Sequence, residues 1–237
     1  MRTAFAHTLG ALIAGAGLAA CNTSQPGETG LVLFTPRDCG NPLLGCDFVR
    51  PVATGASLNV QIMGNGGTST AGFDLESNNP EILAVTKIAD VDGRPTWALA
   101  GGRAGSVYLA AVDEAGAQVD FIDVTVRRPT RLGLVKVAGE AVGPTNEDGV
   151  DQAWTVNADA PVSFQALPHD GNTQLMGILD YVLVVPQGST LLASEQSSSD
   201  RATGYLYVQP PAGDYPFTFE LAAPDSAVAV DAILHAR

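Results

Sequence analysis

The sequence predicts an all-β protein built from two β-sandwiches in tandem. Stretches in which apolar and polar residues alternate recur at intervals of about 8–12 residues, and long helical periodicity is absent. Turn residues separate nearly all of these stretches, and the chain contains 26 Gly and 15 Pro with only 16% charged residues. This composition is typical of secreted β-rich domains. The 237 residues are enough for two domains that each bury a core.

The first half of the chain shows the clearest alternation. Leu58, Val60 and Ile62 fall on one face of a strand expected over 57–63. Further strands are expected over 73–75, 82–87, 96–100, 106–112 and 118–126. Turns are expected over 78–81, 90–93 and 113–116, where Asn, Asp, Pro and Gly gather. Aromatic residues that fall on strand positions in both halves are expected to pack in the cores: Phe73, Trp97, Phe121, Trp154, Phe164, Phe217 and Phe219.

A basic segment containing Pro129 separates two apolar stretches and predicts a domain boundary. We therefore expect one sandwich over 31–128 and a second over 129–237. The strands of the second are expected over 132–137, 152–156, 162–167, 179–185, 190–193, 204–209, 215–221 and 227–236. The basic residues near the boundary are expected to pair with acids across the junction rather than to form a partner-binding patch: Arg127, Arg128, Arg131 and Lys136.

The first domain resembles a group 2 bacterial immunoglobulin-like domain. The resemblance rests on LESNNPEILAV over 75–85, AGSVYLAA over 104–111 and the closing VTV over 124–126. It covers about residues 30–128 and implies an immunoglobulin-like β-sandwich, to which the segment between Cys39 and Cys46 is an addition. In the second domain, Gly213-Asp214-Tyr215 resembles the approach to the penultimate strand of many immunoglobulin-like sandwiches, where the Tyr forms a corner. Pro216 is unusual in such a strand.

The N-terminus resembles a bacterial lipoprotein signal peptide. Arg2 precedes an apolar run that ends in the lipobox Leu18-Ala19-Ala20-Cys21. The resemblance implies cleavage after residue 20, acylation of Cys21 by lipid such as palmitate, and a membrane anchor in the bacterial cell envelope. Asn22, where an Asp would favour retention at the inner membrane, favours the outer membrane. Residues 21–30 are then the lipidated Cys and a short flexible tether. An ordinary cleaved signal and an uncleaved membrane helix are the alternatives.

Cys39 and Cys46 remain once Cys21 carries the lipid. In an exported protein, two cysteines close in sequence are expected to form a disulfide. Metal binding is the alternative, and it would need further ligands.

Charge and motifs exclude several classes of function. The formal net charge of −13 opposes nucleic-acid binding. The sequence contains no recognised hydrolase, metalloprotease, P-loop or dinucleotide signature, so we expect no enzyme and no cofactor. His169 lies among residues that are typical of a turn. A hydrolase role for His169 would require folding to bring a nucleophile next to its ring. His235 is expected at the surface. Asn146, Asp148 and Asp151 are weak calcium candidates whose order does not match an EF-hand loop.

Tyr205 and Tyr207 alternate with apolar residues, so one of the two sets faces outward. The tyrosine pair is a candidate ligand surface. Two tandem immunoglobulin-like β-sandwiches behind a lipid anchor favour a non-enzymatic interaction or scaffold protein of the cell surface or periplasm, with a protein or glycan partner. A carbohydrate- or peptidoglycan-binding module is the alternative, and an exposed tyrosine pair would favour it.

Overall fold

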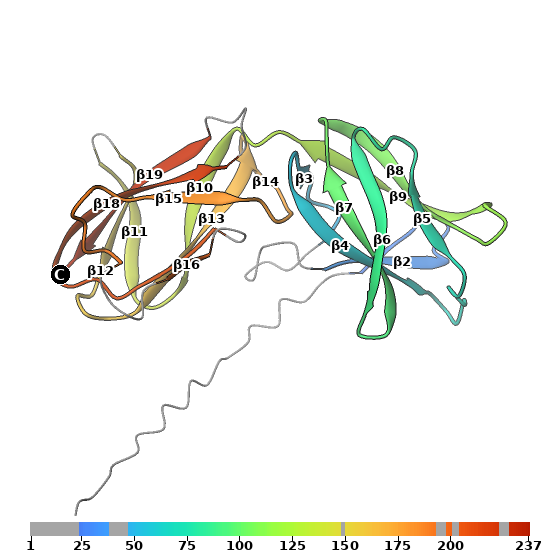
Figure 1. Ribbon diagram of the computed structural model, residues 1–237, viewed down its shortest axis with the longest axis horizontal. Helices are drawn as coiled ribbons and strands as arrows, with labels where there is room; N and C mark the ends of the chain where they lie inside the picture. Colours follow the sequence, from blue (N-terminus) through green and yellow to red (C-terminus); the bar gives the residue numbers. More distant parts are fainter. Residues whose placement is uncertain (1–23, 38–46, 148–149, 193–197, 201–203, 223–227) are drawn as a thin grey trace, which may run out of the picture.

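The computed structural model describes residues 24–37, 47–147, 150–192, 198–200, 204–222 and 228–237. These residues form strands and turns, arranged as two β-sandwiches that follow one another along the long axis of the molecule (Figure 1). The predicted lipidation site Cys21 and the predicted disulfide partners Cys39 and Cys46 lie outside the described residues.

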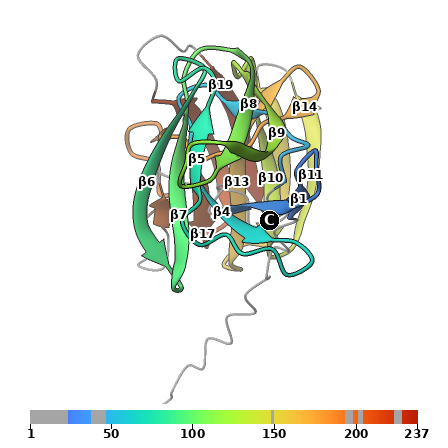
Figure 2. The ribbon, with the colours of Figure 1, turned by 90° about the vertical axis from the view of Figure 1, so that its right-hand side faces the viewer.

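The first sandwich is in front in Figure 2, which looks along the long axis. The strands of one sheet, in spatial order, are β1 (Gln25–Pro26), β2 (Val32–Arg37), β4 (Ser57–Gly64), β7 (Arg94–Gly101) and β6 (Leu83–Val91). The strands of the facing sheet are β3 (Val52–Ala53), β9 (Gln118–Arg127), β8 (Gly105–Val112) and β5 (Asp74–Ser77). All paired strands are antiparallel except β3 and β9, which run parallel.

The second sandwich repeats this arrangement. One sheet contains β10 (Arg131–Ala138), β13 (Val162–Asp170), β17 (Tyr205–Val208) and β16 (Ser198–Asp200), with β14 (Thr173–Gln174) paired to β13. The other contains β11 (Ala141–Glu147), β12 (Val150–Val156), β19 (Ala229–Ala236), β18 (Gly213–Leu221) and β15 (Tyr181–Val184). The strand parallel to the last strand is here β12, which has 7 residues and pairs with β19 on one side and β11 on the other.

Both sandwiches have the immunoglobulin topology. In each, the first, second, fifth and fourth main strands form one sheet, while the third, sixth and seventh form the other. The protein is therefore all-β, with two tandem immunoglobulin-like β-sandwiches, as the sequence predicts. The last strand of the first sandwich ends at Arg127, and the first strand of the second begins at Arg131.

The predicted strand over 190–193 is wrong in the part described, because residues 191 and 192 form a turn. Leu191 is fully buried although it is not in a strand, so its apolar character reflects a loop that packs on the core. The sequence interpretation also missed β2 and β11. Each contains a proline, Pro36 and Pro144, and proline in a sequence argues against a strand.

Most of the predicted core aromatics are buried. Trp97, Phe164 and Phe219 are each no more than 1% exposed, and Trp154 and Phe217 are nearly as deep. Phe73 packs at the margin of the core. Phe121 differs: it is half-buried on an outer face, edge-on to Tyr108 at a centroid distance of 5.2 Å.

Local side-chain chemistry makes the predicted turns. Asp92 and Gly93, both with positive φ, join β6 to β7, as a tight hairpin between right-twisted strands requires. Asp113 accepts backbone hydrogen bonds from Ala115 and Ala117 and shapes the hairpin between β8 and β9. The predicted corner is also present: the Tyr215 hydroxyl donates to the Pro211 carbonyl at 3.0 Å, and Pro216 does not prevent it.

Backbone hydrogen bonds join the two sandwiches. The loop between β14 and β15 lies against residues 51–57 of the first sandwich. The Met176 backbone exchanges two hydrogen bonds of 2.9 Å with the backbone of residues 51–53. The Ile178 backbone exchanges two with Ser57, at 2.7 and 2.9 Å. Leu175 and Met176 are each 1% exposed, and the buried apolar residues of both sandwiches form one connected cluster. A junction with four backbone hydrogen bonds and an apolar centre restrains domain motion.

One predicted ion pair crosses the junction. The Arg127 guanidinium lies 3.4 Å from the Asp170 carboxylate. Arg131 instead donates to the Gly171 carbonyl, so the expectation that the basic residues all pair with acids is only partly met.

Gly177 sets how closely the junction packs. Its φ is +114°, and a Cβ at this position would lie 2.6 Å from the Ala56 side chain of the first sandwich. Both the backbone conformation and the contact therefore require glycine.

We expect Gly177→Ala to loosen the junction and to lower the free energy of unfolding by about 2 kcal/mol, because strain and overlap act together. Small-angle scattering should show a broader range of intersandwich arrangements, and denaturant titration should show the loss of stability. Gly188→Ala is the matched control: Gly188 also has positive φ, at +83°, but no atom lies near its added Cβ. Equal behaviour of the two variants would contradict a special role for the junction.

Candidate functional site

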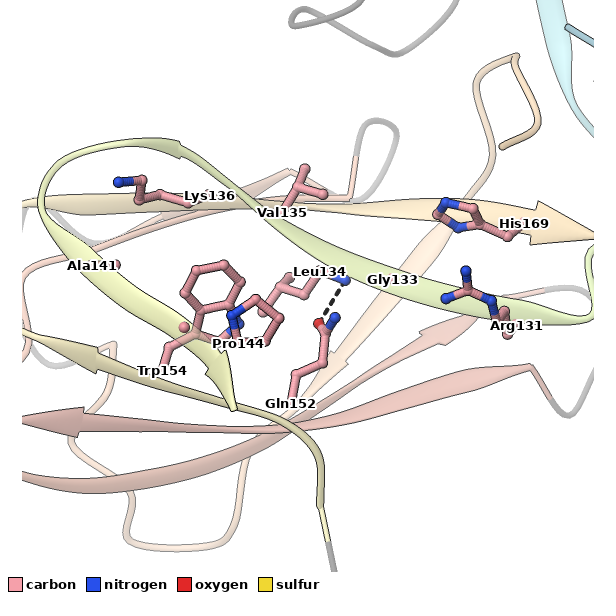
Figure 3. A pocket seen from close by; sticks show the side chains of 11 residues that line it. Arg131, Gly133, Leu134, Val135, Lys136, Ala141, Pro144, Gln152, Trp154 and His169 are labelled. Atoms are coloured by element: carbon pink, nitrogen blue, oxygen red, sulfur yellow. Dashed lines mark hydrogen bonds between the residues drawn. The ribbon is translucent and has the colours of Figure 1, made fainter. Parts of the chain in front are cut away.

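A groove opens along one edge of the second sandwich, between β10 and the hairpin of β11 and β12 (Figure 3). Its volume is about 450 Å³. It forms here because β10 is the free edge of one sheet and β11 is the free edge of the other. None of its lining residues is acidic, although the chain carries 25 Asp and Glu.

The floor of the groove contains an unsatisfied donor. Trp154 on β12 is 5% exposed, and its ring meets Phe164 edge-on at a centroid distance of 5.2 Å. Its indole Nε1 is buried and has no hydrogen-bond partner in the described structure. A buried N–H without an acceptor costs about 1–3 kcal/mol. A ligand that brings an acceptor into the groove would recover part of that cost.

Gln152 bridges the two sheets across the groove. Its Oε1 accepts the backbone N–H of Leu134 at 2.8 Å, the hydrogen bond drawn in Figure 3. The Leu134 N–H therefore points away from β13, toward the open edge. In an antiparallel pair these directions alternate along the strand, so the backbone groups of Leu132 and Lys136 face the same edge.

Basic side chains lie along the rim. Arg131 and Lys136, both exposed, stand near opposite ends of the β10 segment that lines the groove. Lys136 makes no ion pair among the described residues.

His169 also lines the groove. Burial and the nearby Arg131 charge lower its pKa below the ordinary value, so the ring is neutral at neutral pH. Its Nδ1 lies 3.1 Å from the Leu167 carbonyl and must donate to it, because a carbonyl only accepts. Within the described ranges, neither a hydroxyl nor a carboxylate is hydrogen-bonded to this ring. The arrangement that would make a hydrolase of it is therefore not assembled there.

The predicted tyrosine surface is less open than expected. Tyr205 and Tyr207 share one face of β17 but are only half-exposed. Their cross-strand neighbours on β13, Gln165 and Ser163, are no more than 1% exposed. The two rings thus stand at the border of a covered surface rather than on a free platform.

The calcium candidates are only partly described. Asp148 lies outside the described residues, as does the side chain of Asn146. Asp151 uses its carboxylate to accept the backbone N–H of Asp231 at 3.0 Å. Among the described residues, no three His, Cys, Asp or Glu side chains are grouped as metal ligands.

His235 belongs to a polar cluster that the sequence interpretation missed. Its Nδ1 lies 2.8 Å from the Asp214 carboxylate, and its Nε2 lies 3.0 Å from the Glu147 carboxylate. The imidazole and Arg237 lower the pKa of Asp214 through hydrogen bonds. Glu147, Asp214 and His235 lie on β11, β18 and β19, which come together only in the folded sheet, so no local sequence pattern predicts the cluster.

A buried carboxylate clamps the N-terminal segment of the first sandwich. Asp120 on β9 is fully buried and accepts the backbone N–H groups of Thr29, Leu31 and Val32 at 2.8–2.9 Å. Burial opposes its ionisation, but these hydrogen bonds and one from Phe121 outweigh it and lower the pKa of Asp120. Gly27 passes so close that a Cβ there would lie 2.3 Å from the carboxylate.

The clamp corrects the predicted tether. Residues 24–30 are expected to be flexible, but they include β1, which pairs with β2. The backbone N–H of Glu28 also donates to the Phe121 carbonyl at 2.8 Å. The segment looked like a linker because its partners lie about 90 residues later in the chain. No helix in the described part of the chain is long and apolar enough to span a membrane.

Comparison with known proteins gives only distant structural likenesses. No family model and no curated protein sequence matches the chain. Domains 5–6 of the S-layer protein SbsC are 17% identical, with 79% of this chain and 93% of that chain covered and a TM-score of 0.32. The Bacteroides ovatus glucan utilization protein SGBP-B, solved with a mixed-linkage heptasaccharide, is 13% identical over 81% of this chain and 45% of its own, with a TM-score of 0.33.

The Escherichia coli adhesin FdeC is 12% identical over 90% of this chain and 66% of its own, with a TM-score of 0.28. These TM-scores are too low to carry a functional argument. The fold follows from the strand order of this chain, and its function has to be argued from its own residues.

We expect Asp120→Ala to lower the free energy of unfolding by about 3 kcal/mol, because three buried backbone N–H groups lose a charged acceptor. Since the pKa of Asp120 is lower in the folded chain, the stability from its charge is complete above about pH 4 and is lost as the pH falls further. Denaturant titrations at several pH values measure both effects.

Asp123→Ala is the matched control for this variant, because Asp123 lies on the same strand and is exposed. Equal losses of stability in the two variants would contradict the role given to Asp120. So would an Asp120→Ala variant whose stability falls at low pH as much as that of the parent protein.

Proposed function

We propose that the protein is a lipid-anchored, non-enzymatic binding protein of the bacterial cell envelope, whose second sandwich carries the binding groove. The observation that carries this proposal is the buried indole N–H of Trp154, unpaired in the described structure, on the floor of a groove that has no acidic lining residue and carries Arg131 and Lys136 on its rim. A fold that leaves a buried donor unpaired beside two basic side chains without a carboxylate partner in the described structure is suited to binding rather than to a purely structural role.

The anchor is proposed from the lipobox that ends at Cys21. Acylation there would attach two or three chains, which hold a protein firmly in a membrane. Cys21 precedes β1 by only a few residues, and four residues span at most about 14 Å. The clamp at Asp120 would therefore hold the first sandwich close to the membrane surface, and the junction would hold the second beyond it.

A non-enzymatic role agrees with the chemistry of the groove. Its one titratable group near neutral pH, His169, donates to a backbone carbonyl. Its remaining polar side chains are suited to recognition: a carboxamide, an indole N–H and two basic side chains.

We expect Cys21→Ala to abolish metabolic labelling with palmitate and to release the protein from the membrane fraction, because the thiol that accepts lipid is gone. Cys39→Ser is the matched control and should retain both label and membrane association. Labelling that survives in Cys21→Ala would exclude the proposed anchor. Loss of label in both variants would point to failed export instead, which the amount of processed protein reports.

A further inference from the structure

We propose that the groove of the second sandwich binds an acidic, extended polypeptide segment as an added strand along the edge of β10. This rests on the proposed function as a binding protein and names its ligand class. The segment would approach β10 on the side away from β13, between the two sheets.

The free edge of β10 supplies the backbone groups for strand addition. Leu132, Leu134 and Lys136 direct their N–H and C=O groups outward. The side chain of Gln152 occupies the middle of this edge, where its carbonyl oxygen accepts the Leu134 N–H at 2.8 Å. That oxygen stands where the backbone carbonyl of an incoming strand would bind. A polypeptide can replace it without leaving the N–H unsatisfied.

The charges select an acidic ligand of extended shape. Arg131 and Lys136 are five residues apart on one strand, so their backbones are about 17 Å apart and their side chains leave opposite faces of the strand. A small anion cannot contact both, whereas an extended segment with acids at both ends can. The groove has no acidic lining residue in a chain of net charge −13, so it stands out as a place where acids are attracted.

The aromatic residue of the groove favours a peptide over a sugar. Sugars stack on exposed aromatic faces, but Trp154 is 5% exposed and its ring packs against Phe164. Its Nε1 donor is unpaired but buried in the described structure, so a ligand atom reaches it only if the side chains that line the groove move apart. A single buried donor suits a carbonyl oxygen of a peptide, which reaches in from the strand edge.

The test measures binding of a fluorescent octapeptide of threonine and valine, with glutamate at its second and seventh positions, to the full-length protein in detergent. The two glutamates are five residues apart, as Arg131 and Lys136 are, so they also lie on opposite faces of the added strand. Peptides with lysine in place of glutamate, and an oligosaccharide of uronic acids, serve as comparison ligands. We expect the acidic peptide to bind and the basic one not to bind. The double variant Arg131→Ala with Lys136→Ala should weaken binding at least tenfold, and salt should weaken it in the parent protein.

Two further variants separate strand addition from general charge attraction. Lys136→Pro should bind the peptide at least fivefold more weakly than Lys136→Ala. Both variants lose the lysine charge, but proline also removes a backbone N–H that would pair with the added strand. The hydrogen bonds between β10 and β13 do not use this N–H, so the sheet itself is kept. Trp154→Phe should weaken binding severalfold, because it removes the unpaired donor. The smaller ring leaves a cavity beside Phe164 and lowers the melting temperature, so binding is measured at a temperature where the variant is fully folded. Circular dichroism confirms that each variant is folded.

Three outcomes would overturn this inference. Absence of peptide binding would do so, as would binding that none of the groove variants weakens. Binding of the uronic acid oligosaccharide alone, lost in the double variant, would assign the groove to a glycan instead and leave the proposed function standing. Palmitate labelling of Cys21 does not involve the groove, so failure of the anchor and failure of this ligand class are read in separate experiments.

Discussion

The docking of the loop between β14 and β15 onto the first sandwich is the constraint on which the arrangement of the molecule depends. Two immunoglobulin-like domains joined only by residues 128–130 would be free to reorient. Here Met176 and Ile178 exchange backbone hydrogen bonds with the first sandwich, and Leu175 and Met176 are buried. Backbone hydrogen bonds fix a register, while apolar burial supplies free energy without direction. Together they fix the position of the second sandwich relative to the first.

The groove exists because the first strand of the second sandwich is divided between the two sheets. β10 pairs with β13 in one sheet, and after a short turn the chain continues as β11 and β12 in the other. At that turn Gly139 has a φ of +85°, and a Cβ there would lie 2.4 Å from the Pro161 carbonyl. The two strands diverge from this point, and neither sheet covers the edge of the other. Gln152 spans the gap with one hydrogen bond, which leaves the rest of the edge open.

The sequence predicts the parts of this structure that depend on local chemistry. Alternation located most of the strands, and Asp, Asn and Gly located the turns, because the forces that form these elements act within a few residues. The strands containing Pro36 and Pro144 were missed because proline is compatible with a strand only where its partner does not need an N–H, and the sequence does not show which side is paired. At Leu191 a strand was predicted where the chain forms a turn, because a buried loop residue is as apolar as a strand residue.

The functional features were beyond such reasoning because their parts lie far apart in the chain. Asp120 reads as one more polar residue of an alternating strand, yet it accepts hydrogen bonds from a segment about 90 residues earlier. Trp154 was correctly expected to be buried, but only the structure shows that its N–H finds no acceptor. The basic residues near the boundary were noticed as a group. Their division into Arg127, which pairs with Asp170, and Lys136, which stays free in the described structure, depends on the fold.

The two attachments of the first sandwich have different physical origins, and this separation has a consequence for binding. The N-terminal clamp depends on an ionised carboxylate, whereas the junction depends on backbone hydrogen bonds and apolar contacts. Acidification that protonates Asp120 would free the segment that leads to the proposed anchor. The four backbone hydrogen bonds of the junction contain no titratable group, and the Arg127–Asp170 ion pair that also crosses the junction is partly exposed, so its loss would cost little. The orientation of the groove relative to the first sandwich is therefore less sensitive to pH than the attachment of residues 29–32 to that sandwich.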